Sequence, residues 1–404
     1  MNILLISDRH PCPPKNGLYV PLYEFVLRLR HMPGIRIDLA LPMTETHSAQ
    51  SDLYFQHIHY LPLVHRTTWQ RFIDLVFFKR PPYAMDMIIP TSCIQYDVII
   101  ATPDGFVETL RHMKNILPMS YTMLWINELY STVSLGQILN FQWTNLKKIV
   151  HFPLLMLKHA MIYLHEKRYL STLDAVIVQT PREAARFHTF LSASCTTRAF
   201  VFSNPMKDEL LHYTVEWTAS VILIHAPRHI DEIRAFVRAI SMYIQDNQLH
   251  MMIRICTEQT RLYQDSFAEL ASCVQVMGYQ EHLIDVYHQV FCAIVFTRQR
   301  FGMVNRIKEA MTAGVPVISY PETCQTVGHV EDQKHVLYAK NINQFVKRTV
   351  TLINNREQAT SIGMHARQFI LANEIYGPDQ FIHALFTVIN KPVDMSIRKD
   401  TCVS

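Results

Sequence analysis

The sequence lacks the cysteine patterns that build metal sites and disulfide frameworks. Its eight cysteines include no C-x-x-C pair, and none stands at zinc-ligand spacing from histidine. Several lie inside expected strands, where a free cysteine behaves as a small apolar residue. These absences exclude a zinc-binding module and favour a reducing, cytosolic compartment.

Long apolar runs and concentrated charge are also missing. No run reaches the ~18 apolar residues that span a bilayer. The opening residues MNILLIS have no basic segment, so we expect a first strand and no signal peptide. The net charge of +4 is spread over 404 residues, which gives no indication of nucleic-acid binding. This length and a hydrophobic content of 49% predict a globular protein of at least two domains.

The most informative stretch is 301–320, FGMVNRIKEAMTAGVPVISY. Gly302 follows the apolar run 290–296, and Gly314 stands where a glycine would end a helix. Three apolar residues between these glycines fall at helical spacing: Ile307, Ala310 and Met311. VPVIS then reads as a short buried strand. We therefore predict a glycine turn, a helix and a strand, and the free N–H groups of the first helical turn suit a phosphate.

The remainder of the chain predicts two doubly wound sheets. A strand at 2–7, a loop with Pro and Gly, a helix from Tyr19 and a strand at 35–41 open the chain. A second unit begins at about Thr218. Such sheets bind ligands at the carboxyl ends of their strands, so the loops after the strands are the candidate site segments. Further strands are expected at 96–101, 121–126, 173–180, 221–225 and 249–256.

The stretch 301–320 closely resembles the nucleotide-sugar half-site of family 4 retaining glycosyltransferases. One version of that family's motif reads G-x-x-N-K-x-x-E-A-M-A-x-G-x-P-V-V. The matching positions, with Arg306 in place of the lysine, are Gly302, Asn305, Arg306, Glu309, Ala310, Met311, Gly314, Pro316 and Val317. Another version carries an earlier glutamate, which would fall on Phe301. The segments 173–180, 199–205 and 273–279 resemble further motifs of the same family.

The resemblance implies an α/β protein with the GT-B fold, in which two Rossmann-like domains with parallel sheets face each other across a cleft. Residues 1–205 would form the N-terminal, acceptor domain, and residues 206–376 the C-terminal, nucleotide-sugar domain. A helix within 377–391 would cross back to the N-terminal domain. Residues 392–404 would form a frayed tail.

The resemblance also implies roles on the donor side. Glu309 would accept hydrogen bonds from the donor ribose, and the helix behind Gly302 would face the diphosphate. Arg306 and Arg228 would balance the charge of the leaving nucleoside diphosphate, which makes Arg306 a catalytic candidate. The expected donor-binding residues are Arg228, Gly278, Tyr279, Arg300, Gly302, Met303, Asn305 and Glu309.

Fewer candidates come from the N-terminal half. Gly17 lies in a loop resembling the family's P-x-P-P-x-x-G-G, whose second glycine is Leu18 here, and it is a candidate for substrate binding. Asn127 and Glu128 follow the strand at 121–126, where the family contacts the transferred sugar, and they are catalytic candidates. The alternative for this pair is a plain helix cap.

The implied function is transfer of a sugar from a nucleoside-diphosphate donor to a glycan, lipid-linked or protein acceptor, with retention of configuration. No metal or other cofactor is expected, because the D-x-D motif belongs to the other major glycosyltransferase fold. The family's front-face route uses the donor phosphate to help deprotonate the acceptor, so no dedicated general base is required. Four departures from the family pattern leave open a catalytically degenerate protein that binds a nucleotide or a partner: Phe301, Leu18, Pro205 and the missing lysine after Arg228. A GT-B epimerase or phosphorylase is a third alternative, for which no phosphate-binding or cofactor lysine can be placed.

The segment 141–169 mixes lysines with large apolar residues. A basic amphipathic helix of this kind can lie on an anionic membrane surface, which would place a cytoplasmic protein at the inner face of the membrane. The alternative is a long helix packed on the N-terminal sheet, with its basic residues in water.

Overall fold

The structure is a computed structural model that divides into two compact units, residues 1–204 with 376–404 and residues 205–375. We describe each unit by itself. The described residues are 1–12, 19–45, 51–64, 67, 69–70, 85, 87, 95–126, 130–139, 146–191, 195–204, 208–213, 219–225, 230–257, 259–278, 280, 282–298, 302–372 and 378–389.

Unit 1 is built on a seven-stranded sheet of order β3-β2-β1-β4-β5-β6-β7, in which every pairing is parallel. Its strands are β1 (Asn2–Ser7), β2 (Arg36–Pro42), β3 (His57–Leu61), β4 (Val98–Thr102), β5 (Tyr121–Trp125), β6 (Ala175–Val178) and β7 (Arg198–Val201). Its helices are α1 (Val20–Leu29), α3 (Val107–Ile116), α4 (Tyr130–Leu139), α5 (Leu146–Leu170), α6 (Pro181–Phe190) and α15 (Pro378–Val388).

Both faces of this sheet are buried, which explains its nearly continuous apolar strands. Ile3 and Leu5 of β1 belong to a core cluster with residues of α1 and α15. Leu4 and Ile6 point the other way, into a cluster with residues of α3, α5 and α6. The parallel sheet and its two helical layers confirm the predicted doubly wound architecture.

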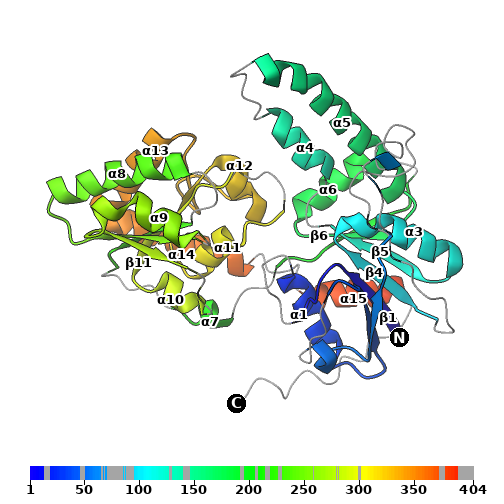
Figure 1. The fold of residues 1–404 in the computed structure, drawn as a ribbon. Helices are drawn as coiled ribbons and strands as arrows, with labels where there is room; N and C mark the ends of the chain where they lie inside the picture. Colours follow the sequence, from blue (N-terminus) through cyan, green and yellow to red (C-terminus); the bar gives the residue numbers. More distant parts are fainter. Residues whose placement is uncertain are drawn as a thin grey trace. The chain divides into compact units, whose positions relative to one another are not determined.

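The last helix packs on the first one. Figure 1 shows α15, in red, beside α1, in blue, although they stand at opposite ends of the chain. Phe381 of α15 contacts an aromatic group, with ring-centroid distances of 5.5 Å to Phe25, 6.2 Å to Trp125 and 5.1 Å to Phe202. Unit 1 therefore closes its core with a helix that follows all of unit 2 in the sequence.

Unit 2 has a six-stranded parallel sheet of order β10-β9-β8-β11-β12-β13. Its strands are β8 (Val221–His225), β9 (Met252–Cys256), β10 (Val274–Met277), β11 (Val290–Val295), β12 (Val317–Ser319) and β13 (Leu337–Tyr338). Its helices are α7 (Asp208–Leu211), α8 (Ile230–Asp246), α9 (Thr260–Ser266), α10 (Leu283–Tyr287), α11 (Asn305–Thr312), α12 (Pro321–Cys324), α13 (Ile342–Asn354) and α14 (Arg356–Ala372).

The predicted glycine turn, helix and strand are confirmed: Gly302 lies in the turn after β11, the helix is α11 and the strand is β12. Gly302 has φ of 68° and Gly314 has φ of 74°, both in the left-handed region that favours glycine. Ile307, Ala310 and Met311 are fully buried, so the apolar face of α11 lies in the core. The two glycines thus mark the two ends of this helix.

A third glycine, on α14, holds the far end of α11 in place. A Cβ atom built on Gly363 would lie 2.0 Å from the carbonyl oxygen of Gly314. The backbone of α14 therefore approaches the turn after α11 more closely than any side chain permits.

We predict that Gly363→Ala destabilises the protein by about 3 kcal/mol or more. Alanine ordinarily stabilises a helix relative to glycine by about 1 kcal/mol. A loss of stability in Gly363→Ala would therefore identify the close approach of the two backbones. Met364→Ala is the control, because Met364 is the next residue of α14 and its side chain is 51% exposed. Urea unfolding followed by circular dichroism measures both, and equal midpoints for the two variants would contradict the prediction.

Candidate functional site

The carboxyl edge of the unit 2 sheet carries the candidate site. The strand order reverses direction between β8 and β11, and ligands of doubly wound sheets bind at such a switch point. His225 is the last residue of β8, and β11 leads through Gly302 into α11. The first turn of α11 therefore follows one of the two strands that form the switch point.

The entry to α11 is held by a hydrogen bond from outside the helix. The backbone N–H of Val304 donates to Thr326 Oγ1 at 3.3 Å, and Val304 itself has an extended backbone, so the helix begins at Asn305. Met303 and Asn305 are partly exposed. The predicted residues Gly302, Met303 and Asn305 thus share one turn.

Arg306 and Glu309 are three residues apart on α11, so their side chains are neighbours on the helix surface. Both are partly exposed. Both also act electrostatically on the buried Tyr287. Burial raises the pKa of Tyr287 well above 10. The charge of Glu309 raises this pKa further, and the charge of Arg306 lowers it. The structure therefore brings two of the predicted residues together beside a tyrosine that the sequence did not single out.

His225 lies in the same group. Its Nε2 atom is 3.3 Å from the hydroxyl of Tyr287, and that hydroxyl donates to the carbonyl oxygen of Arg306 at 3.2 Å. Burial lowers the pKa of His225 well below 6.5, and the charge of Arg306 lowers it further. The imidazole is therefore neutral at pH 7.

The ends of the next two strands complete this edge. Burial raises the pKa of the Cys256 thiol, at the end of β9, to about 11, against the charges of Arg254 and Arg306. Gly278 follows β10, where an added Cβ would lie 3.3 Å from Thr260 Cγ2. Arg306 thus interacts with the ends of both β8 and β9, while Gly278 stands two strands from the switch point.

A further cation stands beyond β11. The guanidinium of Arg298 lies 4.3 Å from the ring centroid of Tyr320, whose hydroxyl donates to Glu232 Oε2 at 2.8 Å. This stacking holds the arginine in one orientation.

The other predicted site residues lie outside the described residues. They are Gly17, Asn127, Glu128, Arg228, Tyr279 and Arg300. Their roles remain predictions. The departures Leu18, Pro205 and Phe301 also lie outside the described part of the chain.

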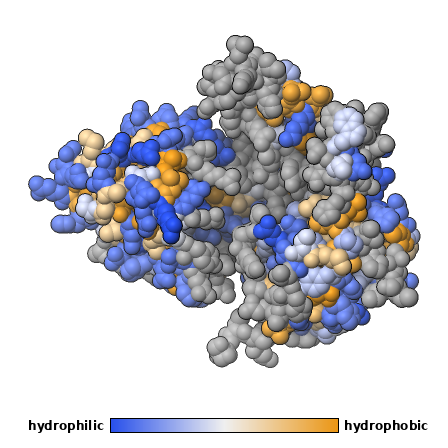
Figure 2. Space-filling view, viewed as in Figure 1, coloured by the Kyte–Doolittle hydropathy of each residue, from blue (hydrophilic) through white to orange (hydrophobic). Residues whose placement is uncertain are grey.

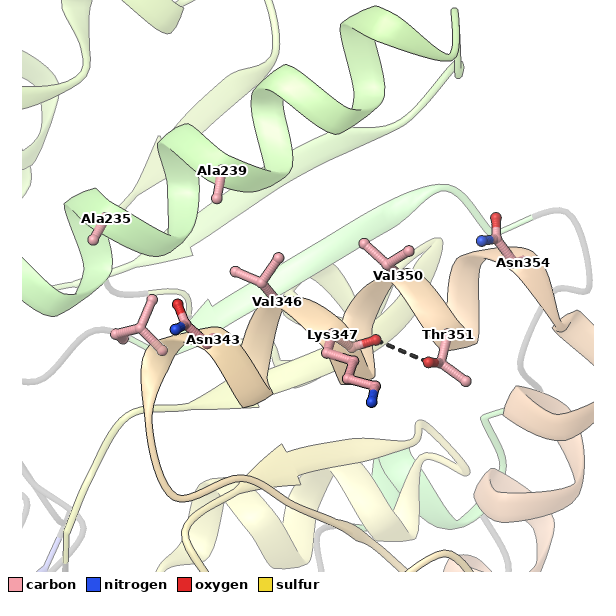
Figure 3. A pocket seen from close by; sticks show the side chains of 9 residues that line it. Ala235, Ala239, Asn343, Val346, Lys347, Val350, Thr351 and Asn354 are labelled. Carbon is pink, nitrogen blue, oxygen red and sulfur yellow. Dashed lines mark hydrogen bonds between the residues drawn. The ribbon is translucent and has the colours of Figure 1, made fainter.

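A groove of about 490 Å³ lies between α8 and α13. Figure 3 shows Ala235 and Ala239 of α8 facing Val346 and Val350 of α13. The dashed line in that view is the hydrogen bond from Thr351 Oγ1 to the carbonyl oxygen of Lys347, at 2.9 Å. None of the predicted site residues lines this groove, so we assign it no part in the site.

Within the described ranges, no three or more His, Cys, Asp or Glu side chains are grouped so that they could hold a metal ion. Nor is any helix there long and apolar enough to cross a membrane. Both statements concern the described side chains only.

Comparison with known proteins supports the same architecture. Residues 220–355 match the sequence model of the family Glycosyl transferases group 1. HepE from Anabaena, solved with UDP, is similar over 96% of this chain and 100% of its own, with a TM-score of 0.61 and 12% identity. Sucrose-phosphate synthase from Thermosynechococcus elongatus is similar over 96% and 98%, with a TM-score of 0.64 and 15% identity.

A third similar structure is a glycosyltransferase from Rickettsia africae ESF-5, with a TM-score of 0.61 and 9% identity over 96% of this chain and 97% of its own. A search of curated protein sequences finds no match. At these identities the similarity shows the fold. The chain therefore has the GT-B fold, and the region from β8 to α13 matches Glycosyl transferases group 1.

Proposed function

We propose that this protein transfers a sugar from a nucleoside-diphosphate donor to an acceptor with retention of configuration. The observation that carries the proposal is the position of Glu309 and Arg306 on the helix that follows β11, beside the switch point of the unit 2 sheet. The family match over 220–355 supports it, because this region contains the whole motif.

The chemistry assigns each group a part. Glu309 would accept hydrogen bonds from the ribose hydroxyls, and charged acceptors make strong ones. The first turn of α11 would receive the diphosphate, because the positive end of the helix dipole attracts an anion. Arg306 would stabilise the negative charge that develops on the leaving nucleoside diphosphate, with Arg228 and Arg300 as further cations.

The remaining donor contacts follow the same scheme. Gly278 and Tyr279 would hold the base, Gly302, Met303 and Asn305 would form the turn that meets the phosphates, and Gly17, Asn127 and Glu128 would contribute from unit 1. UDP and UDP-glucose are the first nucleotides to test, because HepE has been solved with both. A glycan, a lipid-linked molecule or a protein would be the acceptor.

A catalytically degenerate protein is the competing function, since Phe301, Leu18, Pro205 and the missing lysine after Arg228 depart from the family pattern. Donor hydrolysis measured with UDP-, GDP- and ADP-sugars separates the two. Turnover supports transfer, whereas nucleotide binding without turnover of any donor supports the degenerate protein.

We further propose that unit 1 docks on an anionic membrane surface through α5. One stripe of this helix, at spacings of four and three residues, is exposed throughout: Pro153, Leu157, Ala160, Leu164 and Arg168. Leu154 beside it is 59% exposed. Figure 2 shows hydrophobic side chains, in orange, next to hydrophilic ones over α5.

Among the described side chains of α5, the exposed charged ones are positive. Lys158, Lys167 and Arg168 are exposed, whereas Glu166, the single acidic residue of α5, is buried and accepts hydrogen bonds from the backbone N–H of Ser131 at 3.1 and 3.2 Å. An apolar stripe with cations at its edges suits anionic lipid headgroups. Docking there would place the protein at the cytoplasmic face of a membrane, where a lipid-linked acceptor would lie.

Substituting Glu309 by glutamine should weaken UDP binding about 10- to 100-fold, because the ribose loses a charged acceptor. Calorimetry measures the affinity, and Glu269→Gln is the control, on a 63% exposed side chain of the same unit. With 2′,3′-dideoxy-UDP the two variants should bind alike, since the hydroxyls that Glu309 holds are absent. An equal loss for both nucleotides would refute the ribose contact.

The double variant Leu157→Glu/Leu164→Glu should bind vesicles of phosphatidylglycerol at least tenfold more weakly than the native protein, because each buried leucine is worth about 1.5–3 kcal/mol. Leu262→Glu is the control, on a 49% exposed leucine of unit 2. Vesicle sedimentation at low and high salt gives the affinities. Equal sedimentation of the double variant and the native protein would rule out this surface.

A further inference from the structure

We propose that His225 and Tyr287 form a positioning device that sets the first turn of α11, and with it Glu309, relative to the switch point. This proposal deepens the function proposed above and rests on it. Neither residue belongs to the motif that α11 carries. Both are placed to act on that helix through its backbone.

Tyr287 is held at both ends. It closes α10, its side chain is fully buried, and its backbone carbonyl accepts a hydrogen bond from the hydroxyl of Tyr213 at 2.8 Å. Arg254 of β9 donates to the carbonyls of Val286 and His288 at 3.1 and 2.9 Å, which fixes the end of α10 to the sheet. The phenol oxygen is therefore a fixed point beneath α11.

The direction of each hydrogen bond follows from which groups of Arg306, Tyr287 and His225 can donate and which can only accept. A carbonyl can only accept, so the single phenol hydrogen of Tyr287 goes to Arg306 O. The phenol oxygen then accepts from His225, which requires the tautomer with hydrogen on Nε2. A neutral imidazole is needed for an uncharged buried chain, and the lowered pKa of His225 agrees with this.

The chain of hydrogen bonds joins two elements that are distant in sequence. His225 ends β8, and the carbonyl of Arg306 belongs to the first turn of α11. Within the helix that carbonyl already faces the N–H four residues later, so the bond from Tyr287 is additional to the helix's own. This additional bond fixes the position of α11 along the sheet edge and its rotation about its own axis. The directions of its side chains are fixed with it.

Charged and titratable groups of the site act on this pair. Glu309, Cys256 and Arg306 act electrostatically on Tyr287, and Arg306 acts on His225. A shift of α11 would therefore move Arg306 and Glu309 together. The positions of these two side chains depend on an oxygen atom supplied by another helix.

Tyr287→Phe tests the device, since it removes one oxygen and keeps the ring. Tyr263→Phe is the matched control, on a buried tyrosine of α9 in the same unit. Hydrogen exchange of ligand-free protein should be about 3- to 10-fold faster over residues 302–312 in Tyr287→Phe and unchanged there in Tyr263→Phe. This readout needs no ligand and no turnover.

UDP affinity and donor kinetics form the second arm. Tyr287→Phe and His225→Leu should weaken UDP binding about 3- to 10-fold and raise KM for the donor. They should also lower kcat, because Arg306 moves with the helix. His225→Gln should stay within about twofold of the native protein, because its amide still donates a hydrogen bond.

The two hypotheses fail in different ways. Equal exchange over 302–312 in Tyr287→Phe and Tyr263→Phe would overturn the positioning role, as would equal defects in His225→Gln and His225→Leu. Faster exchange without any loss of UDP affinity would overturn it as well. Native protein that binds none of UDP, GDP and ADP would instead refute the proposed function, whatever the exchange shows.

Discussion

Burial of both faces of each parallel sheet is the constraint on which the arrangement of this protein depends. Strands such as β1 and β11 have apolar side chains on both sides, and both of their faces are packed against other side chains. Ligands of such sheets bind where the strands end. The polar groups at the carboxyl edge of unit 2 include His225, Arg306 and Glu309, and the candidate site lies there for that reason.

The helix at the centre of this site is fixed from three directions. Gly302 gives the turn that leads into it, and Thr326 binds the N–H of Val304 just before it. At its far end, the backbone of α14 at Gly363 lies in close contact with the backbone of Gly314. Between them the phenol of Tyr287 bonds to its first turn. A chain with only ten glycines uses three of them where α11 begins, ends and meets α14.

Other polar groups of the structure serve folding. The Asp174 carboxylate, which resembles a family position, accepts from Lys114 Nζ at 2.7 Å and from the N–H and hydroxyl of Thr122 at 2.8 Å each, tying β6 to β5. Glu183 completes a capping box with Thr180 at the start of α6. These two carboxylates act on the fold, whereas Glu309 lies on a partly exposed helix face beside the switch point and is proposed to bind a ligand.

The sequence by itself determined the elements whose signals are local. Apolar runs such as VFCAIV predicted the central strands, and Gly302 and Gly314 predicted both ends of α11, because strand burial and left-handed backbone leave a mark on neighbouring residues. The edge strand β3, HIHYL, was not predicted, since its partly exposed histidines interrupt the apolar pattern. Only the tertiary structure brought Tyr287 and His225, 62 residues apart, beneath α11. Such contacts depend on how separate elements pack, and that packing leaves no periodic trace in the chain.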